Sequence, residues 1–131
     1  MSHRLTITVQ PEVYAICRLE PDAKVPVWAR SENFCCVTRT SAELSIVCAE
    51  QEVPAGTHAE RDRRLLRVEG RLAFSLSGVL ASIASPLADA QVSIFAVSTY
   101  DTDYILVRHA DLERATLALE SAGHTVKRAY E

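Results

Sequence analysis

The sequence predicts an α+β fold in which antiparallel sheets carry helices on one face. Segments with strand-like and helix-like spacing follow the order β-α-β-β-α-β over residues 65–128. Short strand-like runs, interrupted by prolines and polar turns, fill residues 5–49. The chain has 131 residues, 48% of them hydrophobic, which suffices for one domain or two very small ones.

The first strand and helix of the C-terminal half are predicted at residues 65–69 and 78–84. Apolar residues in the second of these segments recur at helical spacing. We expect Ser75 or Ser77 to cap this helix, because a serine side chain can accept a hydrogen bond from the first turn. Pro86 is expected to kink or end the helix, because proline lacks an N–H and clashes with the preceding turn.

A hairpin, a second helix and a last strand complete this half. Residues 92–98 and 104–108 have the composition of paired strands. Asp111 is the expected N-cap of the second helix, and Gly123 fits the position just past its end. The final strand is predicted at residues 125–128.

The N-terminal half is less regular and is interpreted as a degenerate copy of the same unit with shortened helices. Residues 5–9 and 14–19 are predicted to be two strands around Pro11. Residues 34–38 and 44–49 are predicted to form a hairpin.

Two βαββαβ units imply antiparallel four-stranded sheets with helices on one face, which is the ferredoxin-like architecture. The charged segment at residues 60–64 is interpreted as a surface link. We therefore expect a degenerate unit over residues 1–63 and a regular unit over residues 64–131. Many functions share this fold, so the fold alone does not name the activity.

The charge balance and the apolar runs argue against two kinds of partner. The net charge is −3 and no basic run is present, so binding to nucleic acid is not expected. No stretch approaches the roughly 20 apolar residues that a membrane-spanning helix needs. The first residues lack the apolar core of a signal peptide, and a cytoplasmic location is expected.

Cysteines and histidines give no sign of a metal, a cofactor or a catalytic centre. The cysteines lack a C-x-x-C pair and lie in apolar runs, so we expect them to be reduced and buried. The histidines fall at termini or element ends and are expected to be solvated. No serine, histidine and acid fit a nucleophile elbow, and residues 101–103 lack the Gly and Glu of a calcium loop. We therefore expect no enzyme, no cofactor and no metal site.

The turn between the strands at residues 92–98 and 104–108 is the most informative feature for function. It contains no glycine, although a tight hairpin commonly relies on Asn-Gly or Asp-Gly. Its polar side chains either have a role besides reversing the chain or are solvated turn residues. They are Ser98, Thr99, Tyr100, Asp101, Thr102 and Asp103.

A small-molecule site is expected where this turn faces the loop at residues 70–78. Free N–H groups at the start of the first helix attract an anion such as an α-carboxylate. Asp101 or Asp103 can accept an α-ammonium group or a cationic side chain through a charge-assisted hydrogen bond. The strand adds the backbone groups of residues 94–96. Together these features suit a free amino acid.

The runs GRLAFSLSGVLA at residues 70–81 and VSIFAVST at residues 92–99 resemble the ACT domain, an amino-acid-binding regulatory module of the ferredoxin-like fold. The nearest branch is that of aspartate kinases and of the cytosolic arginine sensors of animal TOR signalling. The run STYDTDYILV at residues 98–107 is similar to small stand-alone tandem ACT proteins of bacteria. The likeness extends to residues 14–19 and 37–48.

The resemblance implies that an effector lies between paired ACT units, held by the first β-α loop of one unit and the second strand of its partner. It thus implies a non-enzymatic amino-acid sensor that forms a homodimer and acts on an unidentified protein partner. The residues so implicated are Phe74, Ser75, Leu76 and Ser77 on the loop, Ile94, Phe95 and Ala96 on the strand, and Thr99, Tyr100 and Asp101 at the end of the strand.

Two other hypotheses stay open. In the first, the ACT units only pair to extend a sheet, and the chain is a structural dimerisation module with a vestigial pocket. In the second, the protein is an uncharacterised enzyme, although the sequence offers no nucleophile or base. Core packing accounts for Phe74 and Phe95 as well as ligand contact does, and Ser75 and Ser77 can serve as helix caps.

Overall fold

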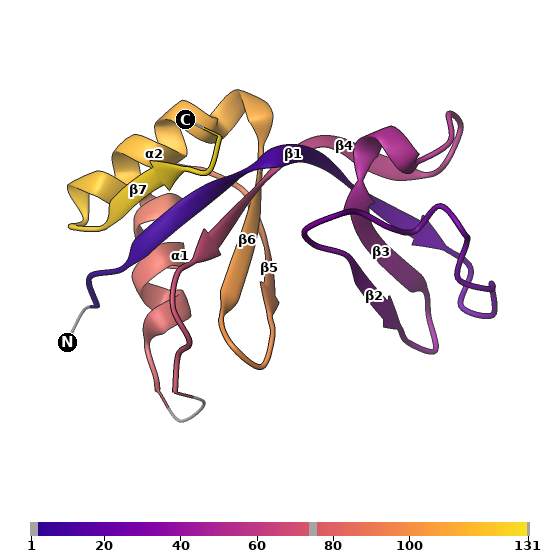
Figure 1. The fold of residues 1–131 in the computed structure, drawn as a ribbon, viewed down its shortest axis with the longest axis horizontal. Coiled ribbons are helices and arrows are strands. Elements are labelled where there is room, and N and C mark those ends of the chain that lie inside the picture. The colour runs from indigo at the N-terminus through magenta and orange to yellow at the C-terminus, as the bar shows by residue number, and fades with distance from the viewer. Residues whose placement is uncertain (1–2, 74–75, 131) are drawn as a thin grey trace. The chain divides into compact units, whose positions relative to one another are not determined.

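The computed structural model of this chain describes residues 3–73 and 76–130 (Figure 1). Its contacts divide the chain into two units. The first unit comprises the described residues up to Pro11 together with those from Arg64 onward, and the second unit is Glu12–Arg63. The N-terminal segment therefore belongs with the C-terminal half, which differs from the division predicted from the sequence.

Two long strands, β1 (Thr6–Leu19) and β4 (Ala59–Val68), contribute one half to each unit. The two strands expected around Pro11 are the single strand β1. Pro11 falls between the residues of β1 that pair with β7 and those that pair with β3, so its missing N–H removes no bond from these two ladders. The charged residues 60–64, expected as a surface link, lie within β4.

The remaining elements of the first unit follow the predicted order. They form a sheet with the strand order β7-β1-β4-β6-β5. The pair β5–β6 is antiparallel, from Ile94 opposite Val107 to Ser98 opposite Asp103, whereas β1 and β7 are parallel. This parallel pair departs from the antiparallel sheet that was predicted, because the N-terminal strand inserts between β7 and β4. The elements are α1 (Val79–Asp89), β5 (Ile94–Ser98), β6 (Asp103–Arg108), a 3₁₀ turn (His109–Asp111), α2 (Leu112–Ser121) and β7 (Thr125–Arg128).

Both helices cover one face of this sheet, as predicted (Figure 1). Side chains two residues apart on β1, β4 and β6 point to that face and meet α1 and α2 in one hydrophobic core. The core side chains include Ile7, Val9, Leu66, Val68, Ile105 and Val107 from strands, and Ile83, Leu87, Leu112, Ala115 and Leu119 from helices.

Within the described residues, no helix is long and apolar enough to cross a membrane.

Helix α1 continues through Pro86 to Asp89, so Pro86 does not end the helix, which was one of the two outcomes predicted for it. Proline provides no N–H for the carbonyl four residues earlier, which belongs to Ser82. The Nε2 of His124 donates to that Ser82 carbonyl at 2.9 Å, while its Nδ1 accepts from the Leu5 N–H at 3.1 Å. His124 is only 5% exposed, which corrects the expectation of a solvated side chain. A residue distant in sequence thus replaces the hydrogen bond that proline removes.

Gly78 is the N-cap of α1, in place of the serine cap that was predicted. Its φ of +83° lies in the left-handed region, which glycine adopts without the steric cost of a Cβ. The Ser82 hydroxyl donates to the Gly78 carbonyl at 2.8 Å. Ser77 instead presents its carbonyl to the Nε2 of His3 at 2.8 Å, and Ser75 lies outside the described residues.

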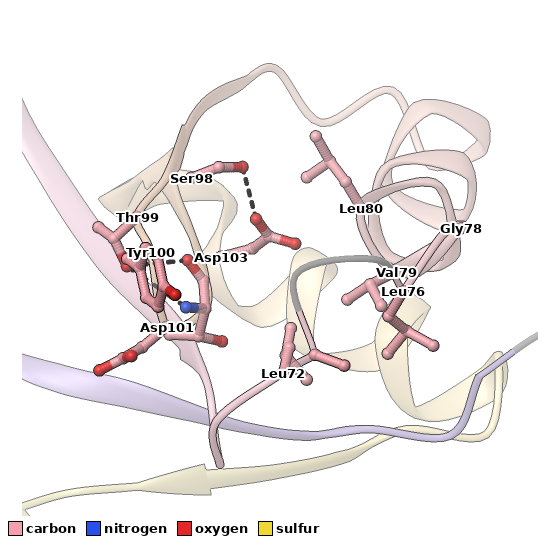
Figure 2. Close-up of a pocket in the computed structure, with 12 residues that line it drawn as sticks. Leu72, Leu76, Gly78, Val79, Leu80, Ser98, Thr99, Tyr100, Asp101 and Asp103 are labelled. Atoms are coloured by element: carbon pink, nitrogen blue, oxygen red, sulfur yellow. Dashed lines mark hydrogen bonds between the residues drawn. The ribbon is translucent and has the colours of Figure 1, made fainter.

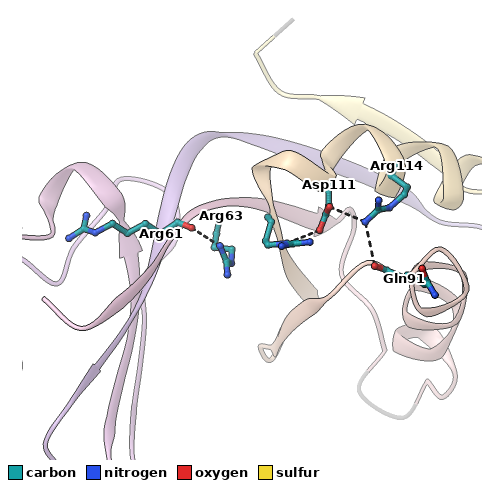
Figure 3. A network of polar contacts seen from close by, with 6 residues as sticks. Arg61, Arg63, Gln91, Asp111 and Arg114 are labelled. Carbon is teal, nitrogen blue, oxygen red and sulfur yellow. Dashed lines mark hydrogen bonds and ion pairs between the residues drawn. The ribbon is translucent and has the colours of Figure 1, made fainter.

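Asp111 precedes α2 as predicted, but its carboxylate makes no capping hydrogen bond. It accepts from the Nε of Arg108 at 2.9 Å and from the guanidinium of Arg114 at 3.0 Å. Arg114 also donates to the Gln91 carbonyl at 3.4 Å, as Figure 3 shows. The buried carboxylate therefore links the end of β6 and the first turn of α2, and through Arg114 the turn after α1.

The second unit contains the predicted hairpin, formed by β2 (Cys36–Arg39) and β3 (Leu44–Ala49). β3 also pairs antiparallel with β1, from Tyr14 opposite Ala49 to Leu19 opposite Leu44. Residues 12–63 of the second unit are all described and include one 3₁₀ turn but no α-helix. A second βαββαβ unit is therefore not confirmed.

The four cysteines are not all buried. Cys17 and Cys48 are buried in the core of the second unit, but Cys35 is exposed and Cys36 is half-buried. The hydrogen bond from the Cys48 thiol lowers the pKa of Cys17, and the same bond raises the pKa of Cys48. Exposure of Cys35 follows from its place immediately before β2, in a segment without regular structure.

Arg64 is a buried cation of the first unit with no carboxylate partner among the described residues. Its guanidinium donates to the Gln10 carbonyl at 3.1 Å and lies 5.4 Å from the centre of the Tyr130 ring. Arg128 lies 5.9 Å from the same ring. The electron-rich face of Tyr130 therefore offsets part of the cost of burying Arg64.

The pKa of Tyr130 is lowered from its ordinary value of 10.0. Burial acts to raise this pKa, but hydrogen bonds and positive charge from Arg64 and Arg128 outweigh it. The folded protein therefore releases the phenol proton more readily than the unfolded chain, and stability rises with pH from the lowered pKa up to about pH 10. We expect the stability of Tyr130→Phe not to rise with pH in this range. Urea unfolding at several alkaline pH values measures the free energy of unfolding of both proteins. Parallel pH profiles of the two proteins would contradict the prediction.

Candidate functional site

A cavity of about 570 Å³ opens in the first unit between the β4–α1 loop, the first turn of α1 and the β5–β6 turn (Figure 2). Its size lies in the range of small-molecule pockets. The lining is apolar on the loop and helix side and polar on the turn side. It consists of Leu72, Ala73, Leu76, Gly78, Val79, Leu80, Ser98, Thr99, Tyr100, Asp101, Thr102 and Asp103.

The β5–β6 turn is shaped by its own threonines. The Thr99 N–H donates to the Thr102 carbonyl at 2.9 Å, and the Thr99 hydroxyl bonds the same residue. Thr102 is buried, and its hydroxyl donates to the Val68 carbonyl at the end of β4 at 2.7 Å. These bonds between side chains and backbone hold the turn without glycine, which explains part of its polar composition.

Asp101 joins the turn to the β4–α1 loop. The Leu72 N–H donates to the Asp101 carbonyl at 2.8 Å, and the Arg71 Nε lies 3.2 Å from Asp101 Oδ1. The Arg71 and Asp101 side chains are 79% and 50% exposed. The carboxylate of Asp101 is therefore paired with a cation at the mouth of the cavity.

Asp103 begins β6 and lies opposite Ser98 in the antiparallel pair. The Ser98 hydroxyl donates to one oxygen of its carboxylate. Figure 2 shows this carboxylate in the space between the turn and the first turn of α1, on the side of Leu80. Serine is a neutral donor, so this hydrogen bond brings no positive charge to the Asp103 carboxylate in the cavity wall.

The opposite wall carries the N-terminal end of α1. Gly78, Val79 and Leu80 line the cavity there. The first amide groups of a helix have no acceptor within it, and the helix dipole adds a partial positive charge at this end. The cavity thus has the partial positive charge of the helix end on its largely apolar side and the Asp103 carboxylate on its polar side.

The structure brings together four of the ten residues predicted for the site, Leu76, Thr99, Tyr100 and Asp101. Phe74 and Ser75 lie outside the described residues. Four further predicted residues are described but do not line the cavity: Ser77, Ile94, Phe95 and Ala96.

The strand residues miss the cavity because the end of β5, and not its middle, forms the wall. Phe95 lies on the outermost strand and is 36% exposed. The expected loop wall at residues 70–78 included Leu72, which lines the cavity, but the sequence prediction did not place Leu80 in the site. The only sequence signal of Leu80 is its helical spacing, which also describes core residues.

Comparison with known proteins agrees with this fold. The family model of the ACT domain matches residues 58–121, and a second model, described as an N-terminal domain, matches residues 12–56. Protein Atu0741 from Agrobacterium tumefaciens has a solved structure with a TM-score of 0.93 and 34% identity, covering 99% of this chain and 97% of that one. The regulatory subunit of aspartate kinase from Thermus flavus gives a TM-score of 0.63 at 12% identity, over 92% of this chain and 99% of that one, and so shows likeness of fold alone.

The human protein CASTOR3P is 34% identical over 102 residues. The alignment covers 68% of this chain and 63% of that protein, so the chain spans less than two thirds of this curated relative.

The fold and the cavity define this protein as a small α+β domain with a cavity that is apolar on one side and polar on the other. The chain belongs to the ACT domain family, as the sequence predicted.

Proposed function

We propose that this protein is a non-enzymatic sensor that binds a free amino acid in the cavity of the first unit. The observation that carries the proposal is the pair of opposed walls. The N-terminal end of α1 is complementary to an α-carboxylate, and the Asp103 carboxylate is complementary to an α-ammonium group. A zwitterion satisfies both walls at once.

The apolar lining supports an organic ligand over an inorganic ion. Leu72, Leu76 and Leu80 provide surface for the aliphatic part of a side chain. A cavity of about 570 Å³ exceeds what a single ion needs and accommodates an amino acid of any size. We propose no cofactor, metal or catalytic step for this site.

The proposal includes a homodimer that completes the site. Among the strands that the structure describes, β5 pairs only with β6, so its other edge is available for a second chain. In such a pair, Ile94, Phe95 and Ala96 of one chain would approach Leu76 and Ser77 of the other. The second unit would be a degenerate ACT unit that supports this assembly.

The role of the bound amino acid would be regulatory. Membership of the ACT domain family and the likeness to a regulatory subunit of aspartate kinase support this role over an enzymatic one. Occupancy of the cavity would change the affinity of this protein for an unidentified protein partner in the cytoplasm.

Screening the twenty amino acids by thermal shift, followed by calorimetry, tests the proposal. A ligand at 100 times its Kd stabilises the folded protein by about 2.7 kcal/mol, so at least one amino acid should raise the melting temperature measurably. No shift with any of them at millimolar concentration would refute the proposal.

The exposed edge strand also favours a second candidate, a structural dimerisation module with a vestigial pocket. Phe95 is a large apolar side chain that is 36% exposed on this edge. Sedimentation that shows a dimer indifferent to all twenty amino acids would favour this candidate.

A further inference from the structure

We propose that Asp101 is a positioning residue, which with Arg71 fixes the two walls of the cavity against each other, and that it does not share the ligand-binding role that the proposed function gives to Asp103. The inference rests on the proposed function. It assigns different roles to two carboxylates that are two positions apart in one turn.

The contacts of Asp101 all lead to the loop. Its backbone carbonyl accepts from the Leu72 N–H at 2.8 Å, and its carboxylate accepts from the Nε of Arg71 at 3.2 Å. Two consecutive loop residues are therefore attached to one turn residue. A two-point attachment restrains both the position and the orientation of the loop where it enters the cavity wall.

A third bond holds the turn itself in place. The buried Thr102 hydroxyl donates to the Val68 carbonyl at 2.7 Å, which anchors the turn to the last residue of β4. The loop leaves β4 at this point, so its first residues and the turn share one anchor. Leu72 then enters the cavity wall at a position that Asp101 determines.

The two carboxylates differ in the charge of the groups around them. Arg71 forms an ion pair with Asp101, so the pair as a whole presents no net charge to a ligand. Asp103 accepts from the neutral Ser98 hydroxyl and forms no ion pair with any described residue. A cationic group in the cavity is therefore attracted to Asp103 much more strongly than to Asp101.

The ion pair is exposed, which limits the expected effect of breaking it. Exposed pairs shift an equilibrium by up to about fivefold. The bond between Leu72 and Asp101 uses backbone atoms and survives side-chain substitution. Loss of either charged side chain should therefore loosen the loop without unfolding the protein.

Calorimetry with the amino acid selected in the screen tests the assignment on five variants of the full chain: Arg71→Gln, Asp101→Asn, their double variant, the charge swap Arg71→Asp with Asp101→Arg, and Asp103→Asn. We expect each of the first two to weaken binding about threefold to fivefold, and the double variant to be no weaker than either. The swap should restore affinity to within about twofold of the wild type, because it rebuilds the pair. Asp103→Asn should lose far more affinity than any of these variants.

The opposite pattern overturns the inference. If Asp101→Asn loses as much affinity as Asp103→Asn while Arg71→Gln binds normally, Asp101 contacts the ligand directly. A swap that fails to recover binding, with an unchanged melting temperature, also overturns it.

A ligand-free measurement separates this inference from the proposed function. If the wild type binds no amino acid, the proposed function fails, and amide hydrogen exchange at Leu72 still tests the positioning role. Arg71→Gln and Asp101→Asn should accelerate that exchange equally, and Asp103→Asn should leave it unchanged. Unaltered exchange in the first two variants would refute the positioning role.

Discussion

Replacing His124 with alanine is expected to lower the free energy of unfolding by about 3 kcal/mol. The ring is buried and bonds two backbone groups, the Ser82 carbonyl and the Leu5 N–H. Removing it leaves both without their partner and opens a cavity between α1 and the start of β1. Urea denaturation followed by circular dichroism measures the loss. His58→Ala is the matched control, because His58 is exposed and its removal should cost less than about 0.5 kcal/mol.

A double-mutant cycle with Pro86 identifies the reason for this cost. In Pro86→Ala, the new N–H can donate to the Ser82 carbonyl as in a regular helix. His124→Ala should therefore cost about 1 kcal/mol less in the Pro86→Ala background than in the wild type. Equal costs in the two backgrounds would show that His124 does not substitute for the hydrogen bond that proline removes.

Asp103→Asn is expected to weaken binding of an amino acid about 100-fold, which corresponds to about 2.7 kcal/mol. The substitution removes the negative charge that meets the ammonium group and keeps the size of the side chain. The amide oxygen of asparagine can still accept from the Ser98 hydroxyl, so the turn should keep its shape. Calorimetry measures the affinity, and an unchanged melting temperature without ligand confirms that the fold is intact.

A control of equal charge change separates the local effect from the net charge of the protein. Asp89→Asn removes an exposed carboxylate at the opposite end of α1, far from the cavity lining. It should leave affinity within about twofold of the wild type, because exposed charges beyond a Debye length are screened. An equal loss in both variants, or no loss in Asp103→Asn, would contradict the role of Asp103.

The C-terminal half was predictable because its signals are local. Apolar spacing placed α2, and Asp111 and Gly123 bracket it in the structure as in the prediction. The strands at residues 94–98 and 103–108 follow the apolar runs to within two residues. These features depend on residues within one or two turns of each other, which a sequence displays directly.

The two proline positions that the sequence did not predict have a common origin in contacts between distant residues. Pro86 stays within a helix because of His124, 38 positions away in the chain. Pro11 lies within a strand because two different neighbours pair on either side of it. Sequence rules for proline describe the local chain and contain no information about such partners.

The candidate site divides in the same way. The polar turn at residues 98–103 was predicted, and it lines the cavity. The middle of β5 was predicted from the resemblance, and it lies outside the cavity of a single chain. In the proposed dimer, those residues would contribute to the site of the second chain.

The sequence by itself determined the order of the elements in the C-terminal half and membership of the ACT domain family. Only the tertiary structure decided that the N-terminal strand joins that half, and that Asp101 is paired with Arg71 while Asp103 is not. Periodicity and motifs are properties of neighbouring residues, whereas strand insertion and ion pairing depend on which distant groups meet. Two aspartates in one turn look equivalent in the sequence, and their surroundings make them different.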